Sequence, residues 1–438
     1  MKKTIPFLIC CLIGLSCKKE KEEIFVIEPA PPTGTVELKI DQVINDSSIV
    51  LKWTKPVGAF QKYLLVQTSA YFKNGQFGTF TERIDSSSNI NHLSFTENNM
   101  PVAKSISYYL LVSKDTTVYN QGFQYVAAVS YERPNSLLYG IPLDVLIDKQ
   151  KQRLYIAENK EINIVNYLSG RLITSKEFPA SIGYCYLGDF GGNSELYVPV
   201  NDGWLHILDA STLQLKDRIY VAGEYIGSVV AANGKLYVSS TDRSVGGYSD
   251  CIKVYDRATK NLIGRTGYYE KTRLFALEGS ALELIDLTIN VVPVGLSYYQ
   301  FNTAGMLLLK KEDTYHGDFV MDAGIARSFP DGSKFITSSS GTIFNKSLLF
   351  DRYVKNNGGY AGPYSDFAFN NDGSLIYTAY AAQKKIDVVG YPAMNTVNSY
   401  TTAYYPYKIF RDGNTLICVS KINTNLQETY MLVEKINL

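Results

Sequence analysis

Apolar and polar residues alternate with a period of two in short stretches along most of this chain. In residues 375–380 the alternation follows the polar turn 370–374, where Gly373 can supply the positive φ of a tight turn. Such a stretch is typical of a strand with one buried face. The same turn and strand recur in residues 232–238, 330–336 and 411–417. The pattern therefore predicts an all-β protein built on a repeated hairpin.

The repeat has a long and fairly regular spacing. The equivalent strands open at Leu154, Leu196, Leu236, Leu282, Lys334, Ile376 and Leu416. They lie about 44 residues apart on average, which is the spacing of four-stranded propeller blades. We expect a seven-bladed β-propeller over residues 133–438, or eight blades if the long interval 282–334 contains a further one.

The alternation also places strands within a blade. The sixth blade is expected to hold strands at 366–369, 375–380, 385–389 and 397–401. In the second blade the equivalent strands are expected at 184–187, 196–200, 204–208 and 215–220. The chain ends on a third strand at 429–434, so residues 136–139 are expected to supply the missing outer strand and close the ring.

Short motifs inside the repeats are similar to those of known families. Residues 236–239 read Leu-Tyr-Val-Ser and residues 196–199 read Leu-Tyr-Val-Pro, which resembles the YVTN and WD40-like propellers. Residues 328–334 read Ser-Phe-Pro-Asp-Gly-Ser-Lys, similar to the Pro-Asp-Gly motif of the propeller in TolB-type proteins. The resemblance implies a fold and no particular function, because propellers serve as binders, scaffolds and enzymes.

Residues 35–132 show a different set of short alternating stretches. Strands are expected at 36–40, 48–53, 62–67, 105–112 and 125–130, a pattern typical of a small β-sandwich. Trp53-Thr54-Lys55-Pro56 ends the second strand, and Tyr108 or Tyr109 lies in the fourth. In these positions the segment resembles a fibronectin type III domain. The resemblance implies a spacer or binding scaffold with Trp53 in its core.

The N-terminus has the pattern of a secretion signal. Lys2 and Lys3 precede an apolar run at 5–15 that is too short to span a membrane, so residues 1–16 are interpreted as a signal peptide and not as a short buried helix. Gly14-Leu15-Ser16-Cys17 resembles the lipobox of bacterial lipoproteins, which implies cleavage before Cys17, lipidation of its thiol and anchoring in a membrane.

The segment behind this cysteine indicates where the protein is displayed. Residues 17–34 are charged and then rich in proline, as expected for a tether. Lys21-Glu22-Glu23 resembles the export signal of surface-exposed outer-membrane lipoproteins, although such a charge run can also be a solvated spacer. The expected location is the outer membrane, with the folded part on the cell surface.

Composition and charge exclude several classes of function. Lys and Arg number 43 against 42 Asp and Glu, so no basic excess points to a nucleic-acid partner. Cys185, Cys251 and Cys418 are too widely spaced for a disulfide framework or a zinc knuckle and are expected to be buried thiols.

The chain carries no recognisable catalytic or metal-binding motif. His92, His206 and His316 have no second ligand at metal-binding spacing. The acidic residues of the loop 313–322 do not follow the calcium-loop pattern and are interpreted as solvated. Nucleophile elbows, phosphate-binding loops and dinucleotide motifs are absent from the sequence. We therefore predict no cofactor and no metal, and we favour a non-enzymatic role.

Tyrosine recurs in the links that lead into the inner strands, on the face that usually binds in propellers. The candidate ligand-binding residues are Tyr184, Tyr225, Tyr268, Tyr269, Tyr315, Tyr360, Tyr364, Tyr404, Tyr405 and Tyr407. Such rings suit glycan stacking or a peptide partner, but each can equally pack between blades. Nearby polar contacts are expected from Arg273, Asp318, Asp366 and Lys408.

Three hypotheses for the function follow. The first is a non-enzymatic binding module that takes a glycan or an envelope protein at the propeller face. The second is a propeller enzyme, a polysaccharide lyase or glycosidase, with a pair of carboxylates in the central funnel. The third is a structural subunit of an outer-membrane complex, which an apolar patch on a blade edge would favour.

Overall fold

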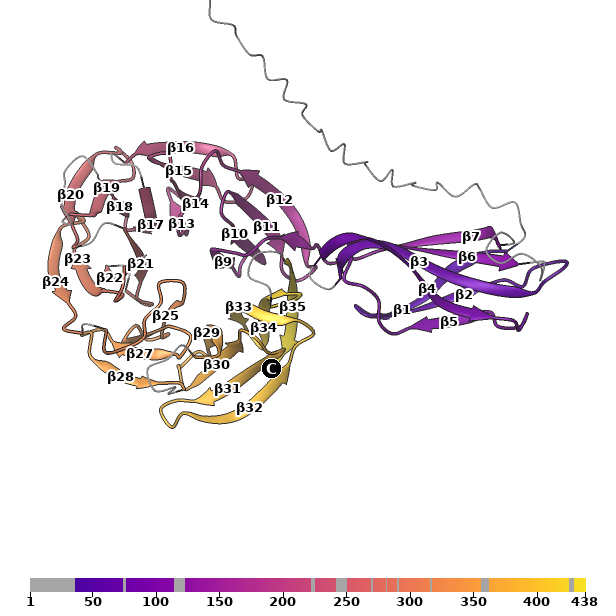
Figure 1. Ribbon diagram of the computed structural model, residues 1–438. Coiled ribbons are helices and arrows are strands. Elements are labelled where there is room, and N and C mark those ends of the chain that lie inside the picture. Colours follow the sequence, from indigo (N-terminus) through magenta and orange to yellow (C-terminus); the bar gives the residue numbers. More distant parts are fainter. Residues whose placement is uncertain are drawn as a thin grey trace, which may run out of the picture. The chain divides into compact units, whose positions relative to one another are not determined.

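Figure 1 shows the computed structural model of the protein, which describes residues 36–73, 76–113, 123–221, 225–241, 250–268, 271–280, 282–289, 291–315, 317–355, 362–424 and 429–438. These residues form strands and turns and contain no helix, so none of them makes a helix that could cross a membrane. The predicted signal peptide, Cys17 and the tether lie outside the described residues, as do Tyr269, Tyr360 and His316.

The described chain forms two compact units. The first contains the described parts of residues 1–67, 81–98 and 107–130, and the second those of 68–80, 99–106 and 131–438. Two small antiparallel sheets come first in the sequence. One has the order β1-β2-β5, with strands β1 Leu38–Asn45, β2 Ser48–Trp53 and β5 Ser94–Glu97. The other has the order β4-β3-β6-β7, with strands β4 Gln76–Ser87, β3 Lys62–Lys73, β6 Ser105–Ser113 and β7 Phe123–Glu132.

Trp53 is a core residue of the first unit, as predicted. Its side chain is buried, and its ring meets the ring of Tyr63 edge-on with 5.7 Å between centroids. Tyr108 is also buried, and its hydroxyl donates to Oε2 of Glu97 at 2.6 Å. Strands β4 and β5 were not predicted. Every residue of β4 remains at least partly exposed and its apolar positions are sparse, and β5 has only four residues.

Seven four-stranded antiparallel sheets follow, which is consistent with a seven-bladed propeller. In Figure 1 the first strand of each sheet lies on the inner side of a ring. Blades 1 to 3 consist of β9 Asp144–Asp148, β10 Arg153–Ala157, β11 Glu161–Asn166 and β12 Arg171–Glu177; β13 Tyr186–Phe190, β14 Asn193–Val200, β15 Trp204–Asp209 and β16 Leu215–Tyr220; and β17 Tyr225–Ala232, β18 Lys235–Thr241, β19 Ile252–Asp256 and β20 Leu262–Thr266.

The remaining blades repeat this order. Blades 4 to 6 consist of β21 Thr272–Ala276, β22 Glu283–Thr288, β23 Leu296–Phe301 and β24 Leu307–Glu312; β25 Ala326–Ser328, β26 Lys334–Thr337, β27 Thr342–Asn345 and β28 Phe350–Tyr353; and β29 Tyr364–Phe369, β30 Leu375–Tyr380, β31 Lys385–Gly390 and β32 Asn395–Thr401. Blade 7 consists of β33 Tyr405–Asp412, β34 Thr415–Lys421, β35 Tyr430–Asn437 and β8 Leu138–Tyr139.

Blade 7 joins the two ends of the propeller chain. Tyr430 pairs with Tyr139 and Met431 with Leu138, so β8 supplies the outer strand of the last blade. This confirms the closing strand predicted at 136–139. In the long interval 282–334 the described residues hold only the last strands of blade 4 and the first strand of blade 5. The described strands therefore make seven blades and not eight.

The inner strand of blade 2 lies two residues later than predicted. It begins at Tyr186 and not at residue 184. Tyr184 instead makes an isolated parallel bridge with Ser228, and its N–H donates to the carbonyl of Gly227 in blade 3 at 2.9 Å. Apolar and polar residues still alternate at this point. However, the backbone of Tyr184 bonds to blade 3, whereas the residues from Tyr186 onward pair with β14 of their own blade.

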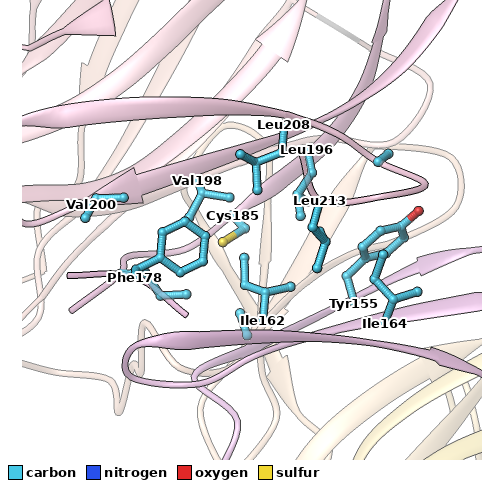
Figure 2. Close-up of a cluster of buried hydrophobic side chains, with 13 residues drawn as sticks. Tyr155, Ile162, Ile164, Phe178, Cys185, Leu196, Val198, Val200, Leu208 and Leu213 are labelled. Carbon is cyan, nitrogen blue, oxygen red and sulfur yellow. The ribbon is translucent and has the colours of Figure 1, made fainter. Parts of the chain in front are cut away.

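Neighbouring blades bury their apolar faces against each other. Figure 2 shows the cluster between blades 1 and 2, in which Ile162 and Phe178 from blade 1 and its exit face Leu196 and Val198 from blade 2. Cys185 lies among them with its sulfur buried. Cys251 and Cys418 are likewise buried and form no disulfide, as predicted for thiols that act as small apolar residues.

Gly183 is expected to be essential for the packing of blade 2 on blade 3. A Cβ at this position would lie 2.4 Å from the backbone oxygen of Gly227, so Gly183→Ala has to push the two blades apart. We expect the free energy of unfolding to fall by about 3 kcal/mol in urea denaturation. Gly264→Ala is the matched control, because its Cβ would lie 3.9 Å from Val254. Equal stabilities of the two variants would contradict this contact.

Candidate functional site

A cavity of about 1210 Å³ runs along the inner strands of the propeller. Residues of β9, β13, β21, β25, β29 and β33 line it, so six of the seven blades contribute. We call it the central channel. Its exposed lining residues lie at the ends of the inner strands and in the turns that follow them: Lys149, Gln150, Lys151, Asp189, Glu278, Gly279, Asn371 and Gly413. These turns form the mouth of the channel.

The wall of the channel is partly apolar and its mouth is polar. Leu146, Phe275, Phe369 and Phe410 line the wall and are half-buried, because they also contact the cores between the blades. Hydroxyl and amide groups line the channel near the mouth, from Ser194, Ser280, Asn370 and Asn371. Half-exposed rings with a few hydrogen-bonding groups are typical of a ligand site.

The inner end of the channel lies where the inner strands begin. Its last lining residues there are Asp144, Tyr184 and Arg273. Residues 320–325, which we call the floor loop, are held behind them by two cations. Nη1 of Arg273 in blade 4 donates to the carbonyl of Ala323 at 2.6 Å, and Nζ of Lys408 in blade 7 donates to the carbonyl of Gly324 at 2.8 Å.

Five charged side chains gather at this end, and we call them the floor cluster: Asp144, Arg273, Arg327, Asp366 and Lys408. Nε and Nη2 of Arg327 donate to the two oxygens of Asp366 at 3.0 and 2.6 Å. Nη2 of Arg273 lies 3.4 Å from Oδ1 of Asp144. All five are buried except Arg327, which is half-buried and lines the channel. Three cations therefore face two carboxylates.

Burial and charge act against each other on these groups. Burial by itself would raise the pKa of Asp366, but the charges of Arg327 and Lys408 and the N–H of Ile409 outweigh it, so this pKa is lowered. Burial lowers the pKa of the Lys408 ammonium from 10.5 to about 8, although Asp366 acts in the opposite direction. At pH 7 the cluster thus keeps both the Asp366 carboxylate and most of the Lys408 charge.

Irregularities in the inner strands place two of these charges. The register between β29 and β30 shifts between Tyr364 and Asp366, and that between β33 and β34 shifts between Pro406 and Lys408. A bulge changes the direction of the following side chain and often occurs next to functional sites. Strict alternation would not give the positions of Asp366 and Lys408, because each follows such a shift.

The predicted tyrosines do not form one ring around the channel. Of the eight that are described, only Tyr184 lines it, beneath the guanidinium of Arg273 at 4.3 Å from the ring centre. Tyr184, Tyr364 and Tyr404 are buried, which fits the packing alternative for these three. The half-buried ones are Tyr225, Tyr268, Tyr315, Tyr405 and Tyr407.

Most of these half-buried rings contact a neighbouring cation. Nζ of Lys310 lies 3.2 Å from the ring centre of Tyr268, and Lys421 lies 4.9 Å from that of Tyr407. Tyr315 instead meets Phe319 edge-on at 4.6 Å. Each ring thus has a local partner within the propeller.

Three of the four predicted polar residues come together. Arg273, Asp366 and Lys408 are all in the floor cluster, whereas Asp318 is exposed. Asp144 and Arg327 were not predicted from the sequence. Their common signal is a charged residue at or near the start of an otherwise apolar inner strand, since such a charge must find a partner when it is buried.

The described residues hold no group of three or more His, Cys, Asp or Glu side chains arranged to bind a metal ion. His206 is half-buried beside Phe178, and neither of its ring nitrogens has a hydrogen-bond partner. Burial lowers the pKa of this imidazole, which therefore remains neutral at pH 7.

Comparisons with known proteins identify the fold and no family. No protein-family model matches the chain, and no curated protein matches it. Among solved structures 1185 chains are similar. One is the hydrazine synthase of Kuenenia stuttgartiensis, with a TM-score of 0.50 and 12% identity over 68% of this chain and 95% of that one. A fold shared so widely does not specify a function.

Tyr404 and Tyr405 test the two interpretations of the tyrosines. Tyr404 is buried and Tyr405 is half-buried, and Lys384 lies within 6 Å of both rings. We expect Tyr404→Ala to lower the free energy of unfolding by about 3 kcal/mol and Tyr405→Ala by about 1 kcal/mol in urea denaturation. If Tyr404→Ala is as stable as the natural protein, the ring of Tyr404 is not needed for packing, and the binding interpretation of this residue is favoured.

Lys408 is expected to make stability depend on alkaline pH. Between pH 8 and 10.5 the folded protein has lost the Lys408 proton while the unfolded chain retains it, so the free energy of unfolding should rise with pH. Relative to Lys408→Met, the natural protein should gain about 2 kcal/mol between pH 7 and pH 10. Urea unfolding of both proteins across this range measures the gain. A constant or falling difference would show that the pKa is not lowered.

Proposed function

We propose that this protein is a lipoprotein of the outer membrane that binds a glycan in the central channel and does not transform it. The anchor would be Cys17, followed by the tether at 17–34 and a fibronectin type III-like spacer over residues 35–132. The propeller over residues 133–438, of the YVTN or WD40-like type, would be the binding module. The lipobox, the acidic run behind it and the channel support this arrangement.

The observation that carries the non-enzymatic role is the pairing of the carboxylates in the floor cluster. A glycosidase needs one carboxylic acid with a raised pKa and a second free carboxylate about 5–10 Å away. The pKa of Asp366 is lowered, and both of its oxygens accept hydrogen bonds from Arg327. Asp144 accepts from Arg273 and from the N–H of Val145. Both carboxylates are thus engaged by neighbouring donors, and the lowered pKa of Asp366 does not suit a general acid, which favours binding over hydrolysis.

The shape of the site favours a glycan over a folded envelope protein. A folded partner would need an extended exposed surface, whereas the lining residues of this site lie inside a channel. Half-buried rings along the wall and hydroxyl and amide groups near the mouth suit the apolar faces and hydroxyls of sugars.

A subunit of an outer-membrane complex is a second candidate. The outer strand β24 exposes Leu307, Leu308 and Leu309 at 40%, 61% and 39% of their surfaces. Three consecutive exposed leucines on an edge strand are unusual, and edge strands can pair with another chain.

Glycan binding can be tested with the chain from residue 35 onward, which retains every described residue. A panel of neutral and acidic polysaccharides should contain at least one ligand, measured by microarray and then by calorimetry. Gln150→Trp with Asp189→Trp narrows the mouth and should weaken binding at least tenfold. Thr396→Trp, an exposed residue of β32, is the control and should bind normally.

Three results would contradict this proposal. The first is the absence of any glycan ligand, together with capture of an envelope protein. The second is the appearance of shortened or unsaturated sugar products, which would support the lyase or glycosidase hypothesis. The third is equal affinity of the mouth variant and its control, which would place the ligand outside the channel.

A further inference from the structure

Arg327 is a fixed cation at the inner end of the central channel. Asp366 holds two of its three guanidinium nitrogens, Nε and Nη2, and the guanidinium carbon lies 4.9 Å from the ring centre of Phe410. These contacts restrict both the rotation and the tilt of the guanidinium plane. About a fifth of the Arg327 side chain is nevertheless exposed, at 21%. Since Arg327 lines the channel, this exposed part is accessible from it.

The third nitrogen of this guanidinium has no hydrogen-bond partner within the described part of the chain. Among the described residues, Nη1 of Arg327 makes no hydrogen bond. An arginine that is oriented by one carboxylate and still has free N–H donors is well suited to bind an oxygen of a ligand. Asp366 acts here as a positioning residue, because it also accepts the N–H of Ile409 at 2.9 Å and is fixed by it.

The charge of the floor cluster indicates which oxygen is suitable. Asp144 and Asp366 balance two of the three cations, and the ammonium of Lys408 donates to the neutral carbonyl of Gly324. A further carboxylate at this end, that of Asp322 in the floor loop, is exposed. The buried part of the cluster thus has one cation more than carboxylates, which favours an anionic ligand there.

The channel above Arg327 suits a carboxylate that is attached to a sugar. Phe275, Phe369 and Phe410 line the wall and can contact the apolar face of a pyranose ring. Ser280 and Asn370 lie nearer the mouth and can bond to hydroxyls. Charges of both signs line the approach, from Lys149, Lys151 and Arg411 and from Asp148, Asp189 and Glu278, so the preference for an anion rests on the inner end of the channel.

We propose that the ligand of the channel is an acidic polysaccharide and that Nη1 of Arg327 binds the carboxylate of one of its uronate residues. This inference rests on the proposed function, since it names the chemical class of the glycan that enters the channel.

The test compares two polymers that differ only in charge. Polygalacturonate should bind to the chain from residue 35 onward at least tenfold more tightly than the same polymer with its carboxylates methyl-esterified, as measured by calorimetry. Poly-glutamate has the same charge on a peptide backbone and should bind at least tenfold more weakly than polygalacturonate. These comparisons need no mutation and therefore do not depend on the stability of a variant.

A double variant tests the residue itself. Arg327→Gln with Asp366→Asn removes both charges and leaves a neutral pair, so neither partner is a buried lone charge. It should reduce the affinity for polygalacturonate at least tenfold and abolish the preference over the methyl ester. The matched control is Arg257→Gln with Glu195→Gln. That pair has the same two-bond geometry, at 2.9 and 3.0 Å, and does not line the channel. The control should bind as the natural protein does.

The outcomes separate this inference from the function on which it rests. Suppose that the charged and esterified polymers bind equally well and that the variant with Gln150→Trp and Asp189→Trp binds neither. The channel would then still be a glycan-binding site, but the proposed role of Arg327 would be overturned. Full affinity in the Arg327 and Asp366 variant would overturn it as well. If poly-glutamate binds more tightly than polygalacturonate, the ligand of the channel is an acidic peptide and not a uronate polymer. Failure of every glycan to bind would overturn both proposals.

Discussion

The arrangement of this propeller depends on the pairing of β8 with β35. Among the described residues, Tyr430 pairs with Tyr139 and Met431 with Leu138, and the N–H of Gly140 donates to the carbonyl of Thr429 at 3.1 Å. These contacts join the start of the propeller chain to its end. Each blade buries its apolar faces against its two neighbours, so an open ring would expose two of these faces to water. The channel depends on the same closure, because Arg273 of blade 4 and Lys408 of blade 7 hold one floor loop from different blades.

The architecture was largely predictable from the sequence, because each blade repeats the same local sequence pattern. A Gly-containing turn followed by an alternating strand placed β30 at residues 375–380 without error and gave the openings of the other second strands to within three residues. The predicted start of the inner strand of blade 2 was wrong, because the backbone there bonds to the next blade and not to its own. Tyr184 bonds to Gly227 of blade 3, and no pattern within its own segment indicates this.

The candidate site was only partly predictable, and the reason is physical. Tyrosines are conspicuous in the links, but a ring can fill space or face a ligand, and the sequence does not distinguish these uses. Tyr404 is buried, whereas Arg327, which the sequence analysis missed, lines the channel. The direction of Asp366 and Lys408 depends on register shifts that arise from pairing with the next strand. Charged residues within inner strands were the more informative signal.

The floor loop makes the two ends of the channel unequal. Its carbonyls at Ala323 and Gly324 are bound to Arg273 and Lys408, behind the last lining residues. A polymer could pass through a pore that is open at both ends, and the pore could bind it at any point along its length. If the floor loop stops the proposed glycan, the channel would admit only a chain terminus, and the polymer would leave by the way it entered. Occupancy would then depend on the number of chain ends and would increase when a long polymer is cut into short ones.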